Sequence, residues 1–142
     1  MYNHESETTM KVLTFGVFDY FHYGHLRLLE RAAELGDTLV VAVQRTEEIQ
    51  KNKPDTDVMF PLEQRMAIIG ALRVVDEVVP YSQVADDISQ IEFDILAVGG
   101  DQNHEGFMTA ISWAKEHGKQ VVVLSRTPNI CSTQIKKNLE TK

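Results

Sequence analysis

Short apolar segments alternate with longer amphipathic segments along the chain. The short ones are rich in β-branched residues and are typical of buried strands: KVLTFGVF (11–18), TLVVAVQ (38–44), DEVVPY (76–81), DILAVGG (94–100) and QVVVLS (120–125). Helical spacing of apolar residues predicts helices in HLRLLERAAELG (25–36), PLEQRMAIIGALRVV (61–75), VADDISQIEF (84–93), FMTAISWAKEHG (107–118) and STQIKKNLE (132–140). Strands that alternate with helices form parallel crossover units. The pattern therefore predicts an α/β fold, a doubly wound, Rossmann-like parallel sheet of about five strands with helices on both faces.

Such sheets bind ligands beyond the carboxyl ends of their strands, where the strand order reverses. Polar segments follow four of the predicted strands: GVFDYFHYGH (16–25), a stretch with Lys51, Lys53 and Pro54, GGDQ (99–102) and RTPNICST (126–133). We predict the stretch with the two lysines to be a loop. The parallel topology gathers all four segments at one edge, where we expect the functional site.

The composition limits the function classes. A chain of 142 residues is long enough for one domain, which we expect over 11–142 after a flexible tail at 1–10. The net charge of −7 argues against broad binding to nucleic acid, although a local basic pocket remains compatible with it. The sequence has no secretion signal and no apolar run of about 20 residues that could cross a bilayer, so we expect a cytoplasmic protein without membrane contact.

The segment after the first strand carries His22 and His25, with Gly24 between them. We expect Gly24 to turn the backbone tightly just before the helix, so that His25 lies on its opening turn. A helix N-terminus binds phosphate through its N–H groups and dipole, and imidazoles there add donors and, when protonated, charge. Taken alone, such a pair is more often core packing, and a zinc site would need four ligands. Its position after the first strand favours a polyphosphate.

Two motifs resemble those of a known family. GVFDYFHYGH resembles the G-x-F-D-x-x-H-x-G-H signature of the nucleotidyltransferase superfamily, and RTPNICSTQIK (126–136) resembles the R-T-x-x-I-S-T-T-x-I-K signature of its cytidylyltransferase branch. The similarity runs from about Met10 to the C-terminus and is greatest to the small glycerol-3-phosphate cytidylyltransferases. The resemblance implies transfer of CMP from CTP to a small phosphorylated alcohol, with glycerol 3-phosphate as the leading acceptor. It also implies Mg²⁺ bound with the triphosphate and a homodimer.

The resemblance also implies roles for individual residues. The expected catalytic residues are His22, His25, Lys51 and Arg126. Arg65 and Arg73 are expected to bind the acceptor substrate, and no residue is assigned as a metal ligand. The residues expected to bind the nucleotide are Gly16, Val17, Phe18, Asp19, Gly24, Lys53, Asp101, Thr127, Ser132 and Thr133.

Other interpretations stay open. The two lysines could simply be solvated, Asp101 could only cap its turn, and Arg65 and Arg73 could lie on the wet face of their helix. Cys131 stands where the second signature has serine, and Val17 stands where the glycerol-3-phosphate enzymes often have threonine.

Two rival functions also remain. The tracts PLEQRMAIIGAL, GGD and CST also resemble heptose-phosphate adenylyltransferases, although the Arg-Thr pair at 126–127 favours the cytidylyltransferases. A non-catalytic nucleotide sensor on the same fold is the second rival.

Overall fold

A parallel sheet forms the centre of the protein, as the alternating pattern predicts. The computed structural model describes residues 9–55, 57–99 and 105–124. In this part of the chain the strand order is β3-β2-β1-β4-β5, and all neighbouring strands are parallel. The strands are β1 (Lys11–Gly16), β2 (Thr38–Gln44), β3 (Glu77–Tyr81), β4 (Ile95–Gly99) and β5 (Gln120–Leu124). The order reverses between β1 and β4, which places the ligand-binding crevice of such sheets beyond their carboxyl ends.

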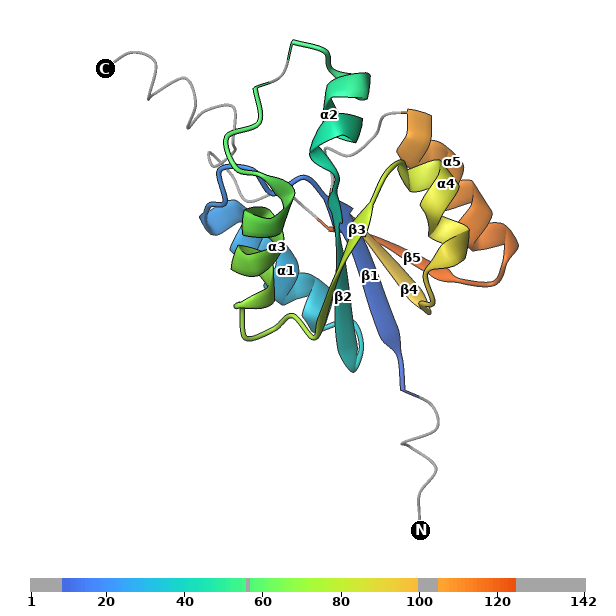
Figure 1. Cartoon of the computed structure of the whole chain (residues 1–142). Helices are drawn as coiled ribbons and strands as arrows, with labels where there is room; N and C mark the ends of the chain where they lie inside the picture. Colours follow the sequence, from blue (N-terminus) through green and yellow to red (C-terminus); the bar gives the residue numbers. More distant parts are fainter. Residues whose placement is uncertain (1–8, 56, 100–104, 125–142) are drawn as a thin grey trace.

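Helices cover both faces of the sheet (Figure 1). α1 (Tyr23–Ala33) and α3 (Leu62–Gly70) lie on one face. α4 (Val84–Asp87), the 3-10 turn η2 (Ile88–Gln90) and α5 (Glu105–Glu116) lie on the other. α2 (Thr46–Asn52) extends beyond the carboxyl end of β2, at the top of Figure 1. Within the described ranges, no helix has the length and apolar character that a membrane span requires.

Several of the predicted helix boundaries differ from those in the structure. α2 occupies much of the stretch that we predicted to be a loop; acidic residues in its first turn and Lys51 in its last complement the helix dipole. α3 ends at Gly70 rather than at residue 75, and the helix predicted over 84–93 is split into α4 and η2. The helix predicted at 132–140 and most of the predicted tail lie outside the described residues.

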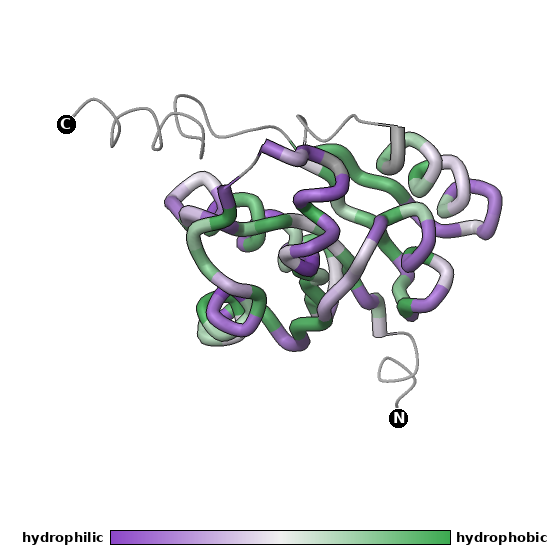
Figure 2. The backbone as a smooth tube through the Cα atoms, turned by 45° about the horizontal axis from the view of Figure 1, so that its top comes forward, coloured by the Kyte–Doolittle hydropathy of each residue, from purple (hydrophilic) through white to green (hydrophobic). Residues whose placement is uncertain are grey.

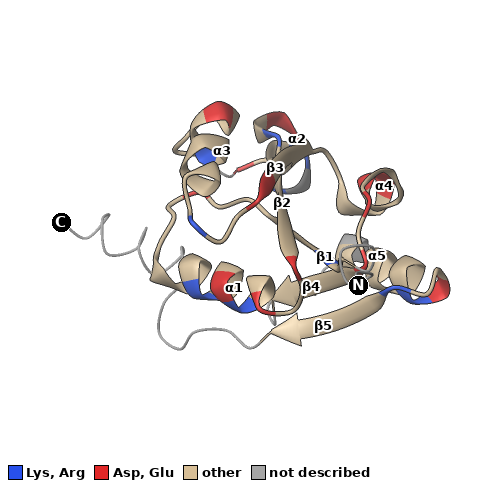
Figure 3. Cartoon of the chain, turned by 90° about the horizontal axis from the view of Figure 1, so that it is seen from below, with Lys and Arg blue, Asp and Glu red and all other residues tan. Residues whose placement is uncertain are grey.

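The core consists of two apolar clusters, one on each face of the sheet. Successive residues of β1 point to opposite faces, so Val12 packs in one cluster and Leu13 in the other. Figure 2 shows hydrophobic stretches of backbone running through the middle of the molecule, and Figure 3 shows charged residues on the helices and at strand ends. The inner strands β1 and β2, together with β4, are buried on both faces, which explains why they read as continuous apolar runs rather than as alternating ones.

Three aspartates extend the sheet pairing at its amino-terminal edge. Each directly precedes a strand and makes two hydrogen bonds to one residue of the neighbouring strand or of the segment just before it. The aspartate N–H donates to the carbonyl of that residue, and one carboxylate oxygen accepts from its N–H. The pairs are Asp37 with Met10, Asp76 with Leu39 and Asp94 with Lys11, with donor–acceptor distances of 2.8–3.0 Å. These clamps fix the strand register. Met10, which we predicted to be part of the flexible tail, is therefore held by Asp37.

We predict that Asp76→Ala will destabilise the fold without affecting the opposite end of the sheet. The buried Leu39 N–H loses its carboxylate acceptor, and an unsatisfied buried donor costs about 1–3 kcal/mol. Denaturant unfolding measures this loss. Glu116→Ala on the exposed surface of α5 is the control, expected within about 0.5 kcal/mol of wild type. Equal stability of the Asp76 variant and wild type would contradict the clamp.

Candidate active site

The segment between β1 and α1 has an unusual backbone. Phe18 and Tyr20 adopt φ angles of 56° and 51°, in the left-handed region that aromatic residues rarely occupy. Gly16 permits this path, because a Cβ atom at this position would lie 2.5 Å from the Phe18 ring. We expected the tight turn at Gly24, but Gly24 lies within the first turn of α1. Strain of this kind persists only where surrounding contacts enforce it, and it is concentrated at functional sites.

His22 and His25 cap α1 reciprocally. His22 is the N-cap residue, and its Nδ1 accepts a hydrogen bond from the Gly24 N–H at 3.0 Å. The His25 Nδ1 accepts one from the His22 N–H at 3.2 Å. The two rings stack, with centroids 3.9 Å apart and planes inclined by 17°. This is the geometry of a capping box, with imidazoles in place of the usual hydroxyl and carboxylate.

The capping bonds determine which ring nitrogen carries the proton. Because each Nδ1 accepts, the neutral form of each ring must carry its hydrogen on Nε2. The His22 Nε2 is buried and has no partner among the residues that the structure describes. A buried N–H without an acceptor is costly, so an acceptor oxygen supplied by a ligand would be stabilised there. The start of α1 therefore offers two oriented Nε2–H donors.

Burial keeps both imidazoles neutral. It lowers the pKa of His22, and it lowers that of His25 from 6.5 to about 4, with a smaller contribution from the neighbouring His22. The rings of Phe18 and Phe21 each lie 5.5 Å from the His25 ring, which explains the loss of hydration. The positive charge that we allowed for from the sequence is thus absent near pH 7. The histidines serve as neutral hydrogen-bond donors, and fixed charge has to come from lysine and arginine.

Asp19 binds the backbone of a distant segment. Its carboxylate accepts hydrogen bonds from the N–H groups of Met59, at 2.7 Å, and Phe60, at 3.0 Å. The carboxylate is buried, and it fastens the segment before α3 to the loop after β1. Contact of Asp19 with the nucleotide stays a prediction, since both carboxylate oxygens already accept N–H groups of the protein.

Arg65 is completely buried, so the alternative that placed it on a wet helix face is wrong. Its Nε donates to the Phe60 carbonyl at 2.9 Å, and Nη1 donates to the carbonyls of Val17 and Gln44 at 3.0 and 2.7 Å. Its Nη2 donates to the Thr46 hydroxyl at 2.8 Å. Burial lowers the pKa of Arg65, while Asp19 and Tyr81 act in the opposite direction. Direct contact of Arg65 with the acceptor stays a prediction.

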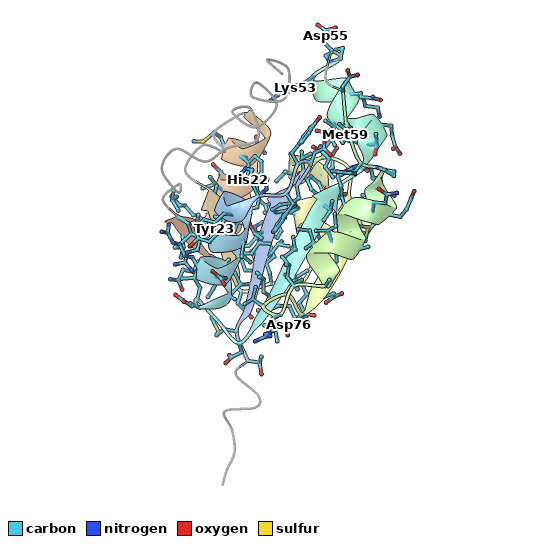
Figure 4. All side chains as sticks on the ribbon, turned by 90° about the vertical axis from the view of Figure 1, so that its left-hand side faces the viewer. His22, Tyr23, Lys53, Asp55, Met59 and Asp76 are labelled. Carbon is cyan, nitrogen blue, oxygen red and sulfur yellow. The ribbon has the colours of Figure 1, made fainter. Side chains whose placement is uncertain are left out.

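The two lysines lie at the same end of the sheet as the histidines. Lys51 is exposed in the last turn of α2, with Nζ 2.9 Å from a carboxylate oxygen of Glu48, which raises the pKa of Lys51. Glu48 in turn accepts a hydrogen bond from the Gln83 amide at 2.9 Å. Lys53 is exposed at the end of α2. Figure 4 shows His22 and Lys53 towards one end of the molecule and Asp76 at the other.

Among the remaining predicted residues that the structure describes, Arg73 is not brought to the histidines. Arg73 is exposed between α3 and β3, three residues before Asp76, which binds Leu39 at the amino-terminal edge of the sheet. Within one chain it lies at the opposite end from His22. The other predicted residues, Asp101, Arg126, Thr127, Ser132 and Thr133, lie outside the described residues, as does Cys131.

Sequence reasoning missed the partners that organise this site. Gln44 and Thr46 bind Arg65, and the Met59–Phe60 peptide groups bind Asp19. Only Thr46 binds Arg65 through its side chain, and a threonine in a polar stretch gives no distinctive signal. The backbone partners left no signal, because any residue type supplies an N–H or a carbonyl.

The described site suits phosphate better than a protein-bound metal. In the ranges that the structure describes, no three His, Cys, Asp or Glu side chains are grouped so as to hold a metal ion. The available groups are N–H donors, a helix N-terminus and nearby lysines. The fold is therefore a doubly wound α/β domain, and its described site offers the kind of donors that phosphate oxygens accept.

Comparison with known proteins identifies the family. Residues 13–138 match the family model described as Cytidylyltransferase-like, and the chain belongs to this family. It is 38% identical over 133 residues to the glycerol-3-phosphate cytidylyltransferase of Bacillus subtilis (strain 168), covering 91% of this chain and 96% of that protein. The chain is therefore an enzyme, a nucleotidyltransferase.

Other relatives are equally similar in sequence. The chain is 39% identical over 132 residues to the bifunctional protein HldE of Cronobacter sakazakii, covering 91% of this chain but only 27% of that protein. Among solved structures, the lipopolysaccharide core biosynthesis protein from Thermoplasma volcanium GSS1 has a TM-score of 0.69 and 28% identity. That similarity covers 84% of this chain and 97% of the other and supports the Rossmann-like fold.

The histidine geometry predicts a specific pH dependence of stability. The unfolded chain takes up a proton on His25 near pH 6.5, whereas the folded chain does so only near pH 4. The neutral ring therefore contributes stability fully above pH 6.5, and that contribution is lost as the pH falls towards 4. Denaturant unfolding should show the stability advantage of wild type over His25→Gln shrinking across this window.

Nuclear magnetic resonance of the ring nitrogens gives an independent check. Both histidines should be Nε2–H tautomers at neutral pH, with His25 titrating near pH 4. A proton on the Nδ1 of either ring at pH 7 would contradict the reciprocal capping.

Proposed function

We propose that the protein is a cytidylyltransferase that transfers CMP from CTP to a small phosphorylated alcohol, with glycerol 3-phosphate as the leading acceptor. The observation that carries the proposal is the capped histidine pair, which presents two neutral Nε2–H donors at the start of α1. The Arg-Thr pair at 126–127 and the similarity to glycerol-3-phosphate cytidylyltransferases support cytosine and this acceptor.

The reaction needs positioning and charge stabilisation rather than a covalent intermediate. An oxygen of the acceptor phosphate attacks the α-phosphorus of CTP, and the bond to the bridging oxygen breaks to release pyrophosphate. The acceptor phosphate is already ionised, so no general base is required. The Nε2–H groups of His22 and His25 donate to the α-phosphate oxygens as their charge grows. Lys51 and Lys53 supply positive charge to the triphosphate, and Arg126 does so by resemblance.

Magnesium enters this proposal with the nucleotide, bound through phosphate oxygens and water, where it neutralises charge on the triphosphate. The carboxylate nearest to the histidines along the chain, that of Asp19, accepts backbone N–H groups instead. By resemblance we also propose a homodimer, and from the sequence pattern a cytoplasmic location. Asp101, Thr127, Ser132 and Thr133 as nucleotide contacts, and Arg65 and Arg73 as acceptor contacts, rest on the same resemblance.

A second candidate is an adenylyltransferase acting on a sugar phosphate of the heptose type. The similarity to HldE at 39% identity favours it, together with the PLEQRMAIIGAL, GGD and CST tracts. Because it transfers AMP from ATP through the same phosphate chemistry, the base and the acceptor are the features that separate the two candidates.

Pyrophosphate release measured over a matrix of nucleotides and acceptors distinguishes them. We expect the highest kcat/KM for CTP with glycerol 3-phosphate, and a much lower value for ATP with any heptose phosphate. Preference for ATP and a sugar phosphate would establish the second candidate. Tight CTP binding without pyrophosphate release for any acceptor would instead indicate a nucleotide sensor.

His22→Ala should lower kcat by about 10²–10³-fold, the usual effect of removing one well-placed donor to a developing oxyanion. His117→Ala is the matched control, because His117 is exposed at the end of α5 and stacks on Trp113. Its kcat should equal that of wild type. A loss below about tenfold in the His22 variant would rule out the assigned role.

A further inference from the structure

A single buried guanidinium joins four segments at the carboxyl end of the sheet, the end that also carries the histidines. Arg65 binds Val17 in the loop after β1, Gln44 at the end of β2, Thr46 at the start of α2 and Phe60 before α3. We propose that Arg65 and Asp19 are positioning residues that hold the lysine-bearing helix α2 and the backbone of Met59 and Phe60 in register with the histidines. The proposal goes beyond the substrate contacts that the resemblance implies, and it rests on the transfer reaction proposed above.

The chemistry of arginine suits this role. Its five N–H groups lie in a planar fork, so every bonded acceptor has its direction fixed by the same rigid group. The Val17 carbonyl lies just after β1 and the Gln44 carbonyl at the end of the neighbouring strand β2, and one Nη1 binds both. With the guanidinium fully buried, water cannot replace a lost acceptor. The ends of the two strands and the start of α2 are therefore held together by one group.

Asp19 completes the attachment from the other side. It accepts the N–H groups of Met59 and Phe60, while the Phe60 carbonyl accepts from Arg65. Opposite charges thus hold one short piece of backbone. The rings of Tyr20 and Phe60 also pack edge to face, with centroids 6.4 Å apart. Met59 and Phe60 follow Lys53 along the chain. Their bonds to Asp19 therefore attach the backbone beyond the two lysines to the loop that carries the histidines.

Thr46 connects the guanidinium to Lys51. Thr46 is the first residue of α2, and its hydroxyl accepts from Arg65 at 2.8 Å. Lys51 lies in the last turn of the same short helix, so the orientation of α2 sets the direction in which Lys51 extends. A misplacement of about 1 Å in a reacting site can cost on the order of 10² in rate. The contribution of Lys51 to kcat should therefore depend on the Thr46 hydroxyl.

Thr46→Val and Thr46→Ser test the connection. Valine keeps the shape but removes the acceptor, whereas serine keeps the hydroxyl. With the nucleotide and acceptor that wild type uses, well below the unfolding temperature, we expect Thr46→Val to lower kcat by about tenfold or more. KM for the nucleotide should change by less than about threefold, because the lysine contact strengthens mainly as charge develops. Thr46→Ser should restore kcat to within about twofold.

Asp19→Asn and Asp76→Ala form the matched pair. Each loses one carboxylate-to-amide hydrogen bond, but Asp76 lies at the opposite edge of the sheet (Figure 4). We expect kcat to fall by about 30-fold or more in Asp19→Asn and to stay at the wild-type value in Asp76→Ala. Amide hydrogen exchange of Met59 and Phe60 in the ligand-free protein should accelerate only in Asp19→Asn.

Failure of this inference can be told apart from failure of the proposed function. Unchanged exchange of Met59 and Phe60 in Asp19→Asn would overturn the attachment, whatever the substrate. Equal losses of kcat in the Asp19 and Asp76 variants, or a Thr46→Val enzyme as fast as wild type, would overturn the positioning role. The absence of transfer by wild type with any acceptor would defeat the proposed function and, with it, the positioning role.

Discussion

The reciprocal bonds between the histidine rings and the start of α1 are the constraint on which the site depends. Each ring uses its Nδ1 to satisfy a backbone N–H, which leaves Nε2–H as the group available to a ligand. The same bonds define where the helix begins, and so where its dipole acts. A protonated Nδ1 could not accept these bonds. Burial and the neighbouring His22 lower the pKa of His25, and this keeps its Nδ1 free to accept the capping bond.

That arrangement is costly and needs support from the surrounding fold. Two aromatic residues adopt left-handed backbone angles in the loop that carries the histidines, and a buried arginine lies beneath it. A buried guanidinium is tolerated only when acceptors surround it, and here four protein acceptors do so. One of them, the Val17 carbonyl, belongs to the strained loop itself. The cation thus stabilises a backbone path that Phe18 and Tyr20 would not adopt alone.

The sequence predicts the sheet well because strands buried on both faces must be apolar throughout. It predicts the location of the histidines because a parallel topology fixes which loops share an edge. It did not predict α2, since seven mostly polar residues carry little helical periodicity. The burial of Arg65 was also missed, because its spacing from Arg73 places both on one helix, whereas the helix ends at Gly70 between them. Asp19 and Arg65 mainly bind backbone groups, whose partners have no residue signature.

The chemistry of the described site explains why two kinds of relatives are almost equally similar to this chain. In the proposed reaction the histidine donors act on phosphate, whereas Asp19 and Arg65 bind mainly the backbone around them. Every nucleoside triphosphate has the same three phosphate groups, whichever base it carries. Identities of 38% to a cytidylyltransferase and 39% to HldE are therefore compatible with one shared transfer site. Selectivity must arise where substrates differ, at the base and the acceptor. Substitutions there can change the substrate without disturbing the histidine caps, which makes the phosphate site and the specificity elements separable parts of the same enzyme.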